Sequence, residues 1–225
     1  MASAGRTYGG KSSDDRRAER RERLLAAGLE LLGDEGLAAF TVRGVCARAG
    51  LTPRYFYEEF GTADELARQL FDREFDLALQ RVGIAVAGAG EDTLVRVDAA
   101  VGAVLDVMTE VPARAAVLLT EASGAGVLAA RRAERMEDVI GVVAGFGRAT
   151  YASGDPRTDA AAVDEGDRAL RVAATFVAGG LAQTIDAWLR GRAPGSRDAL
   201  QRDLAAEIVA VGDAAFARLR AWPEG

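Results

Sequence analysis

The side chains best suited to chemistry lie in one short segment, TVRGVCARAGLTPRYFYEEF, from Thr41 to Phe60. Just after a Thr-Pro pair, this segment carries Arg54, Tyr55 and Tyr57. Arginine can donate two hydrogen bonds to guanine O6 and N7, and tyrosine can contact a thymine methyl group or a phosphate. These residue types at this spacing predict a surface that binds DNA.

Other kinds of chemistry are poorly represented in the chain. It has no histidine and a single cysteine, Cys46, so the usual zinc ligand sets and the Ser-His and Cys-His nucleophile pairs are absent. No phosphate-binding loop, dinucleotide fingerprint or metal motif occurs, and the acidic residues form no isolated pair. We therefore expect no enzymatic activity, no cofactor and no metal site. For Cys46, a small buried filler is favoured over a redox sensor.

The charge is divided unevenly along the chain. The net charge is −6, yet residues 1–54 hold ten arginines and lysines against seven acids, which makes that stretch +3 and the remainder −9. The N-terminal part is therefore where phosphates would be met. The cluster from Arg16 to Arg23 fits either phosphate contact or a solvated face balanced by acids.

Two short helices are expected to position the candidate side chains. Thr41 is a good N-cap for the first, which ends at Gly50. Thr52 and Pro53 are the N-cap and first position of the second. A longer helix precedes them from about Asp14, with the apolar stripe Leu24, Leu25, Gly28, Leu31 and Leu32. Two helices joined by a tight glycine turn are typical of a helix-turn-helix.

The rest of the chain also reads as helical, because no strand-type alternation is sustained. The expected fold class is all-α with about nine helices. We predict a flexible arm at residues 1–13, a helix-turn-helix DNA-binding domain at 14–61, and a ligand-binding and dimerisation domain at 62–225. The last two helices, to about Arg190 and from Ser196, should form an antiparallel hairpin whose inward face includes Phe176.

The run RRERLLAAGLELLGDEGLAAFTVRGVCARAGLTPRYFYEEFGTADEL, from Arg20 to Leu66, resembles the N-terminal domain of TetR-family transcriptional repressors. The resemblance rests on the AA pair of the first helix, the EG before Thr-Val, the RAG turn and the aromatic-rich third helix. The C-terminal two thirds match only in helical layout.

This resemblance implies roles for individual residues. Thr41 and Tyr57 would donate to phosphates, whereas Thr52, Arg54 and Tyr55 would face base edges. The full set of expected DNA-binding residues is Thr41, Arg43, Thr52, Pro53, Arg54, Tyr55 and Tyr57.

Three residues depart from the family pattern near the expected DNA surface. Ala63 stands where a lysine commonly touches the DNA backbone. Glu58 and Glu59 would repel phosphate unless they pair with arginine or face cytosine N4. A helical ligand-binding or scaffold protein without DNA binding is therefore the main alternative, and an enzyme is a remote third.

The resemblance also implies a ligand pocket bounded by the middle helices, although the same apolar residues could fill an ordinary core. The expected ligand-binding residues are Val104, Met108, Met136, Ile140, Phe146, Phe176 and Gln183. Glu121 and Thr175 could add polar contacts.

The expected protein is a homodimer in which the last two helices of each copy form a four-helix bundle, with Gly179 and Gly180 permitting close approach. Its partners would be a double-stranded palindromic operator and a small apolar effector that releases it, with the helix after Thr62 as the lever. No run of about eighteen apolar residues and no secretory signal were found, so no membrane is expected and the cytoplasm is the expected location.

Overall fold

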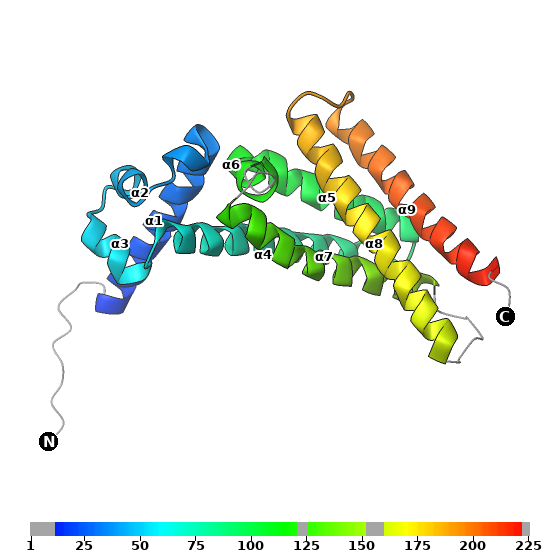
Figure 1. Cartoon of the computed structure of the whole chain (residues 1–225). Helices are drawn as coiled ribbons and strands as arrows, with labels where there is room; N and C mark the ends of the chain where they lie inside the picture. The colour runs from blue at the N-terminus through cyan, green and yellow to red at the C-terminus, as the bar shows by residue number, and fades with distance from the viewer. Residues whose placement is uncertain (1–11, 121–125, 152–159, 222–225) are drawn as a thin grey trace, which may run out of the picture. The chain divides into compact units, whose positions relative to one another are not determined.

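The computed structural model describes residues 12–120, 126–151 and 160–221, and all regular structure in these ranges is helical (Figure 1). The elements are α1 (Ser13–Glu35), η1 (Leu37–Ala39), α2 (Val42–Ala49), α3 (Pro53–Glu59), α4 (Ala63–Gly88), α5 (Thr93–Glu110), α6 (Pro112–Ala115), η2 (Ala116–Thr120), α7 (Val127–Tyr151), α8 (Ala160–Leu189) and α9 (Arg197–Ala221). The predicted all-α class is confirmed. Most of the predicted arm, and Glu121, lie outside the described residues.

The chain divides into two compact units, residues 1–70 and 71–225, with the division inside α4. The boundary expected from the sequence, between residues 61 and 62, lies just before the start of this helix. Each unit is described by itself below.

Unit 1, residues 1–70, begins with α1. Ser12 caps α1: its side chain accepts a hydrogen bond from the backbone N–H of Asp15 at 3.0 Å, and Asp15 accepts one from Ser12 N at 2.9 Å. This capping box satisfies two N–H groups that a helix start otherwise leaves unpaired. The predicted stripe of Leu24, Leu25, Gly28, Leu31 and Leu32 is buried throughout.

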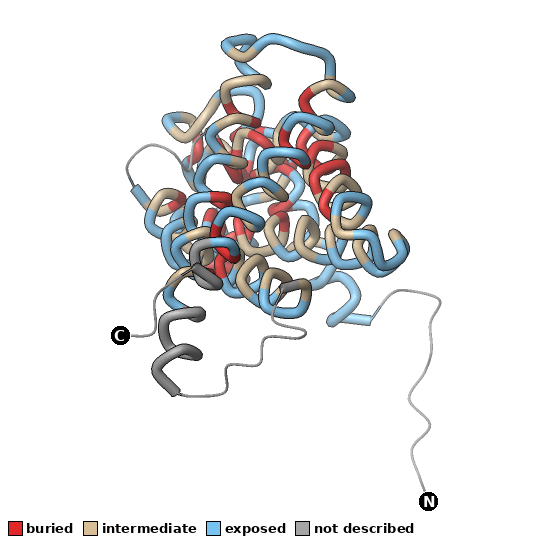
Figure 2. The backbone as a smooth tube through the Cα atoms, turned by 90° about the vertical axis from the view of Figure 1, so that its right-hand side faces the viewer, coloured by how far each residue is buried: buried red, intermediate tan, exposed pale blue. Residues whose placement is uncertain are grey.

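The core of unit 1 is built where α1 meets the elements that follow it. A methyl group built at Gly28 would lie only 3.2 Å from the ring of Phe40, which shows how closely α1 approaches this residue. Phe56 and Phe60 of the α3 segment are almost fully buried, with Leu66 and Leu70 from the start of α4. The buried positions appear as short red stretches along the helices in Figure 2.

Unit 2, residues 71–225, contains an antiparallel hairpin of α8 and α9, as predicted, and α5 packs on α9 (Figure 1). Trp188 Nε1 donates to the carbonyl of Gly195 at 3.0 Å and so closes the turn between the two hairpin helices. A methyl group at Gly102 would come within 2.9 Å of Gln201, which donates to Asp98 Oδ2 at 2.8 Å. This glycine lets α5 and α9 approach closely.

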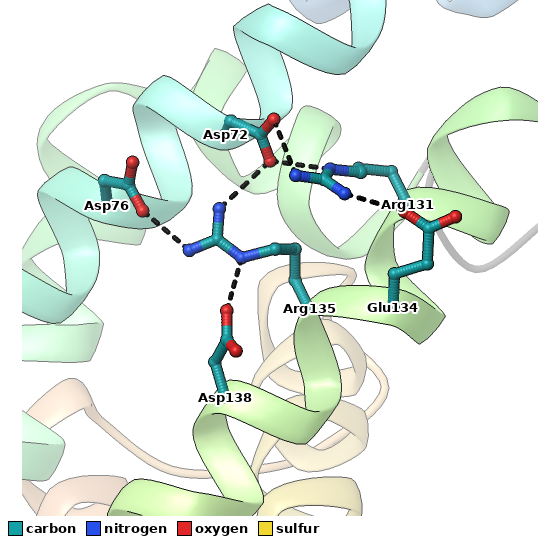
Figure 3. Close-up of polar contacts among 6 residues, drawn as sticks. All are labelled: Asp72, Asp76, Arg131, Glu134, Arg135 and Asp138. Atoms are coloured by element: carbon teal, nitrogen blue, oxygen red, sulfur yellow. Dashed lines mark hydrogen bonds and ion pairs between the residues drawn. The ribbon is translucent and has the colours of Figure 1, made fainter.

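An ion-pair cluster joins α4 to α7 in unit 2 (Figure 3). Arg131 holds Asp72 by two hydrogen bonds of 2.7 and 2.9 Å, and Arg135 bonds Asp72 at 3.0 Å and Asp76 at 2.6 Å. The Arg135 guanidinium also lies 4.4 Å from the centre of the Phe75 ring. Hydrogen bonding to Asp72 is the main cause that raises the pKa of Arg131. The two helices are thus joined by charge-assisted bonds and by this cation–π contact.

One position expected to face inward does not. Phe176 of α8 is 68% exposed. The buried residues of α8 nearest to Phe176 are Ala174, Val177 and Ala178, whose side of the helix is turned about 100° or more from Phe176. The prediction that Phe176 lies on the inner face of the hairpin is therefore wrong.

Within the described residues, one stretch of α8, Arg168–Leu189, has the length and apolar composition to cross a membrane. Only 22% of its most apolar window is buried in this chain. One side of α8 packs on α7 and α9, and the other side leaves apolar residues exposed. An exposed apolar face of this kind often marks an interaction surface.

Candidate nucleic-acid interface and ligand cavity

Helix α2 and the turn that follows it are held by caps at both ends of α2 and by a bond from α1. The Thr41 side chain accepts a hydrogen bond from Gly44 N at 3.0 Å, which confirms it as the N-cap of α2. Gly50 ends α2 in the left-handed region, at φ 62°, where residues with a Cβ are strained. From α1, Arg23 donates to the carbonyl of Ala49 at 2.6 Å. The angle at which α3 leaves the turn is therefore set by the backbone and by α1.

Helix α3 separates its buried and exposed faces clearly. Phe56 and Phe60 are at most 1% exposed, while Tyr55 and Tyr57 are 37% and 61% exposed and the Arg54 side chain is 85% exposed. Pro53 occupies the first turn as predicted, but the Thr52 side chain makes no capping bond. All seven residues expected to bind DNA are exposed: Thr41, Arg43, Thr52, Pro53, Arg54, Tyr55 and Tyr57.

The two carboxylates of α3 are paired with arginines. Glu59 has a side chain only 4% exposed, and it accepts a bond of 2.9 Å from Arg17 Nε of α1. Glu58 accepts a bond of 3.1 Å from Arg54 Nε, and it lies 3.8 Å from Arg20. Their negative charge is therefore offset within unit 1. Pairing with arginine was one of the two arrangements, beside facing cytosine N4, in which these carboxylates were expected from the sequence to be compatible with DNA binding.

The arginines of α1 dock α3. Besides bonding Glu59, Arg17 donates to the Glu58 carbonyl at 3.1 Å. The Arg20 guanidinium lies 4.6 Å from the Tyr55 ring centre, a cation–π contact that restricts how this tyrosine can turn. Sequence reasoning offered only a solvated face or phosphate contact for these arginines. Their spacing, seven and four residues ahead of the buried Leu24, places them on the same side of the helix and was the available signal.

Cys46 is buried, with 3% of its surface exposed. Burial raises the pKa of its thiol, which disfavours the reactive thiolate at neutral pH. This environment agrees with the interpretation of Cys46 as a small core residue.

Unit 2 contains a small apolar cavity between α5, α7, α8 and α9. Its wall includes Val97, Phe146, Ala174 and Ala215, and its volume is about 50 Å³. Sites for drug-sized ligands usually measure roughly 300 Å³ or more. A larger occupant would therefore need the helices to part.

The expected ligand-binding residues are not gathered around this cavity. Phe146 lines it, whereas Met136 and Ile140 pack in a neighbouring core cluster between α7 and α8. On α5, Met108 is buried and Val104 half-buried, and neither lines the cavity. On α8, Phe176 and Gln183 are exposed. Whether any of these residues binds a ligand stays a prediction.

Three kinds of comparison bear on the class of protein. Residues 24–70 match the sequence model for bacterial regulatory proteins of the tetR family. No curated protein matches the sequence.

Several solved structures are similar in fold. The transcriptional regulator FadR from Bacillus subtilis, in complex with stearoyl-CoA, has a TM-score of 0.69 at 14% identity, over 84% of this chain and 98% of that one. The fatty acid degradation regulator FadR from Bacillus halodurans has a TM-score of 0.65 at 14% identity, over 94% and 98%. A TetR-like transcriptional regulator from Rhodococcus sp. RHA1 has a TM-score of 0.60 at 15% identity, over 91% and 98%.

The chain has a helix-turn-helix whose inner side chains are buried and whose second helix is exposed. Together with the fold, this element defines a DNA-binding regulator of transcription. Residues 24–70 match the tetR family of bacterial regulatory proteins, and the chain has the fold of TetR-family regulators. The resemblance drawn from the sequence is confirmed.

Proposed function

We propose that this chain is a homodimeric repressor that binds a palindromic operator in the cytoplasm and is released from it by a small molecule. The observation that carries the proposal is the state of α3, which exposes Arg54, Tyr55 and Tyr57 while both of its carboxylates are held by arginines. A helix that exposes these side chains and whose acids are paired with arginines suits the major groove.

Within the interface, base and phosphate contacts are divided by position. Thr52, Arg54 and Tyr55 lie at the start of α3, where a recognition helix meets base edges. Thr41 and Tyr57 would bond phosphates and set the register of the protein on the duplex. Arg54 must leave Glu58 to reach a base, but an exposed pair at this spacing contributes only about 0.3–0.5 kcal/mol.

The dimer is supported by the exposed face of α8. Val172, Phe176, Gly179, Gly180 and Gln183 recur at helical spacing along it, and all are exposed. In the described residues, nothing lies within 4 Å of a methyl group built at Gly179 or Gly180, so a second helix could approach closely there. A symmetric four-helix bundle of α8 and α9 from two copies would cover this face.

Substitution on this face tests the dimer. Phe176→Glu should convert the protein to a monomer in light scattering, because a charge would be buried in the bundle. Val95→Glu, at a position of α5 that is 51% exposed, is the matched control and should leave the dimer intact. A Phe176→Glu protein that still dimerises would contradict this part of the proposal.

Release by a ligand requires a difference in affinity between two states of the dimer. A hundredfold loss of operator binding needs about 2.7 kcal/mol of such preference, however tightly the ligand binds. The FadR structure that holds stearoyl-CoA is an example of this fold binding a small molecule. In this chain, the cavity of unit 2 is where a ligand would enter, and α4, which continues from unit 1 into unit 2, would act as the lever.

The alternative of a scaffold without DNA binding rested on Glu58, Glu59 and Ala63. Because both carboxylates are paired with arginines, they no longer argue against DNA binding. Only Ala63 remains, as a lost phosphate contact. A mobility-shift assay with DNA flanking the protein's own gene separates the two. We expect a specific band that weakens steeply as salt rises, and its absence would leave the scaffold as the better account.

A further inference from the structure

Arg96 of α5 stands beside the cavity of unit 2. Thr93, three residues before it, and Val97, the next residue, both line the cavity. The Arg96 guanidinium lies 4.9 Å from the ring centre of Phe146, which forms another part of the wall. A cation therefore lies against one wall residue of the cavity without itself forming the wall, and Thr93 is the only hydroxyl-bearing residue among the lining side chains of the described part of the chain.

This guanidinium has unused bonding capacity. Its Nε is buried and makes no hydrogen bond with any described residue. The carboxylates of the same helix and its N-cap have other partners: Asp92 caps Val95 N at 2.9 Å, Asp98 accepts from Gln201 at 2.8 Å, Asp106 pairs with Arg197, and Glu110 pairs with Arg81. A buried donor without a partner is costly, so a ligand that bonds to it gains affinity.

We infer that the cavity and Arg96 together form a binding site for a small carboxylic acid, whose apolar body fills the cavity while its carboxylate bonds the guanidinium. The planar fork of arginine matches a carboxylate in geometry as well as in charge. This inference deepens the ligand part of the proposed function and rests on it only for the claim that the acid releases DNA. Binding of the acid stands on the geometry of unit 2 alone.

The size of the cavity restricts the acid. About 50 Å³ is room for the equivalent of a few water molecules, and thus for a short chain of carbon atoms. Each methylene that enters the cavity should tighten binding about fourfold, and those beyond its capacity should add little. Affinity along a series of straight-chain acids should therefore rise and then level off at a short length.

Isothermal titration calorimetry on the full-length protein, without DNA, tests this site. The probes are butanoate, hexanoate, octanoate and decanoate, with 1-hexanol, hexylamine and hexyl phosphate as head-group controls. We expect hexanoate to bind at least tenfold more tightly than the alcohol, the amine and the phosphate. Equal affinity for 1-hexanol, tighter binding of hexyl phosphate, or no binding of any acid would overturn the inference.

Variants locate the head group. Arg96→Gln should weaken hexanoate at least tenfold and leave 1-hexanol unchanged. Arg202→Gln, at an exposed position of α9, removes the same charge and should have no effect. If Arg96→Gln unfolds, as judged by circular dichroism, Arg96→Lys serves instead, because it keeps the charge and loses the fork. Hexanoate binding that is unchanged in the folded Arg96 variant would refute the site.

The operator complex separates this inference from the proposed function. If hexanoate binds through Arg96 but leaves the specific DNA complex intact, the release mechanism fails and the site stands. If specific DNA binding is found and no acid binds, the site fails and the DNA-binding function stands.

Discussion

Two arginines that pair with neighbouring carboxylates of α3 should differ strongly in their contribution to stability when each is replaced by alanine. Arg17→Ala leaves the Glu59 carboxylate, 4% exposed, without its cation and also removes the bond to the Glu58 carbonyl. Breaking a buried pair costs about 3–5 kcal/mol, but Arg17 is 61% exposed and solvent screening reduces the loss. We expect unit 1 to lose about 2 kcal/mol of its free energy of unfolding.

Arg54→Ala should cost far less stability, because the pair of Arg54 with Glu58 is exposed and contributes about 0.5 kcal/mol at most. Arg16→Ala, at an exposed position of α1, is the control for loss of one positive charge. Hydrogen exchange of peptides from residues 12–70 in the full chain should accelerate about 30-fold in Arg17→Ala and about twofold in Arg54→Ala. Equal acceleration in both would refute the argument that burial of Glu59 makes the difference.

Four further outcomes follow from the same contacts. Arg54→Ala should weaken operator binding by about 1–3 kcal/mol and relax the preference at one base pair, whereas Tyr57→Phe should weaken all sequences alike in fluorescence anisotropy titrations. Gly50→Ala should destabilise the protein by about 1 kcal/mol in urea unfolding, because φ there is positive. Burial raises the pKa of Cys46 above 9.0, so the unfolded chain loses the thiol proton first and the free energy of unfolding should fall as pH rises past about 9. Cys46→Ser should show a smaller fall than the wild type over the same range.

Local signals made the DNA-binding unit predictable. The N-cap at Thr41, the stop at Gly50 and Pro53 in the first turn of α3 depend on residues adjacent in sequence, and all three are confirmed. The stripe of α1 was predictable for the same reason, since helical periodicity alone assigns its buried face.

Contacts between distant residues were harder to foresee. Arg17 and Glu59 are far apart in the chain, so whether Glu59 faced a phosphate or an arginine depended on how α3 lies against α1. In α8, apolar residues occur on more than one side, and composition did not reveal that Phe176 is exposed while Ala174 is buried. Arg96 carried no signal at all, because its place beside Phe146 exists only once α5 and α7 have packed.

Selection of binding sites from a random duplex library is the most direct test of the claim that α3 reads DNA. For the wild-type chain, we expect a palindrome of two half-sites whose centres lie about 34–36 Å apart, one turn of the duplex. The same selection with Arg54→Ala should return that palindrome with the preference lost at one base pair in each half-site. Recovery of no enriched sequence by the wild type, or of an identical sequence by both proteins, would contradict the account.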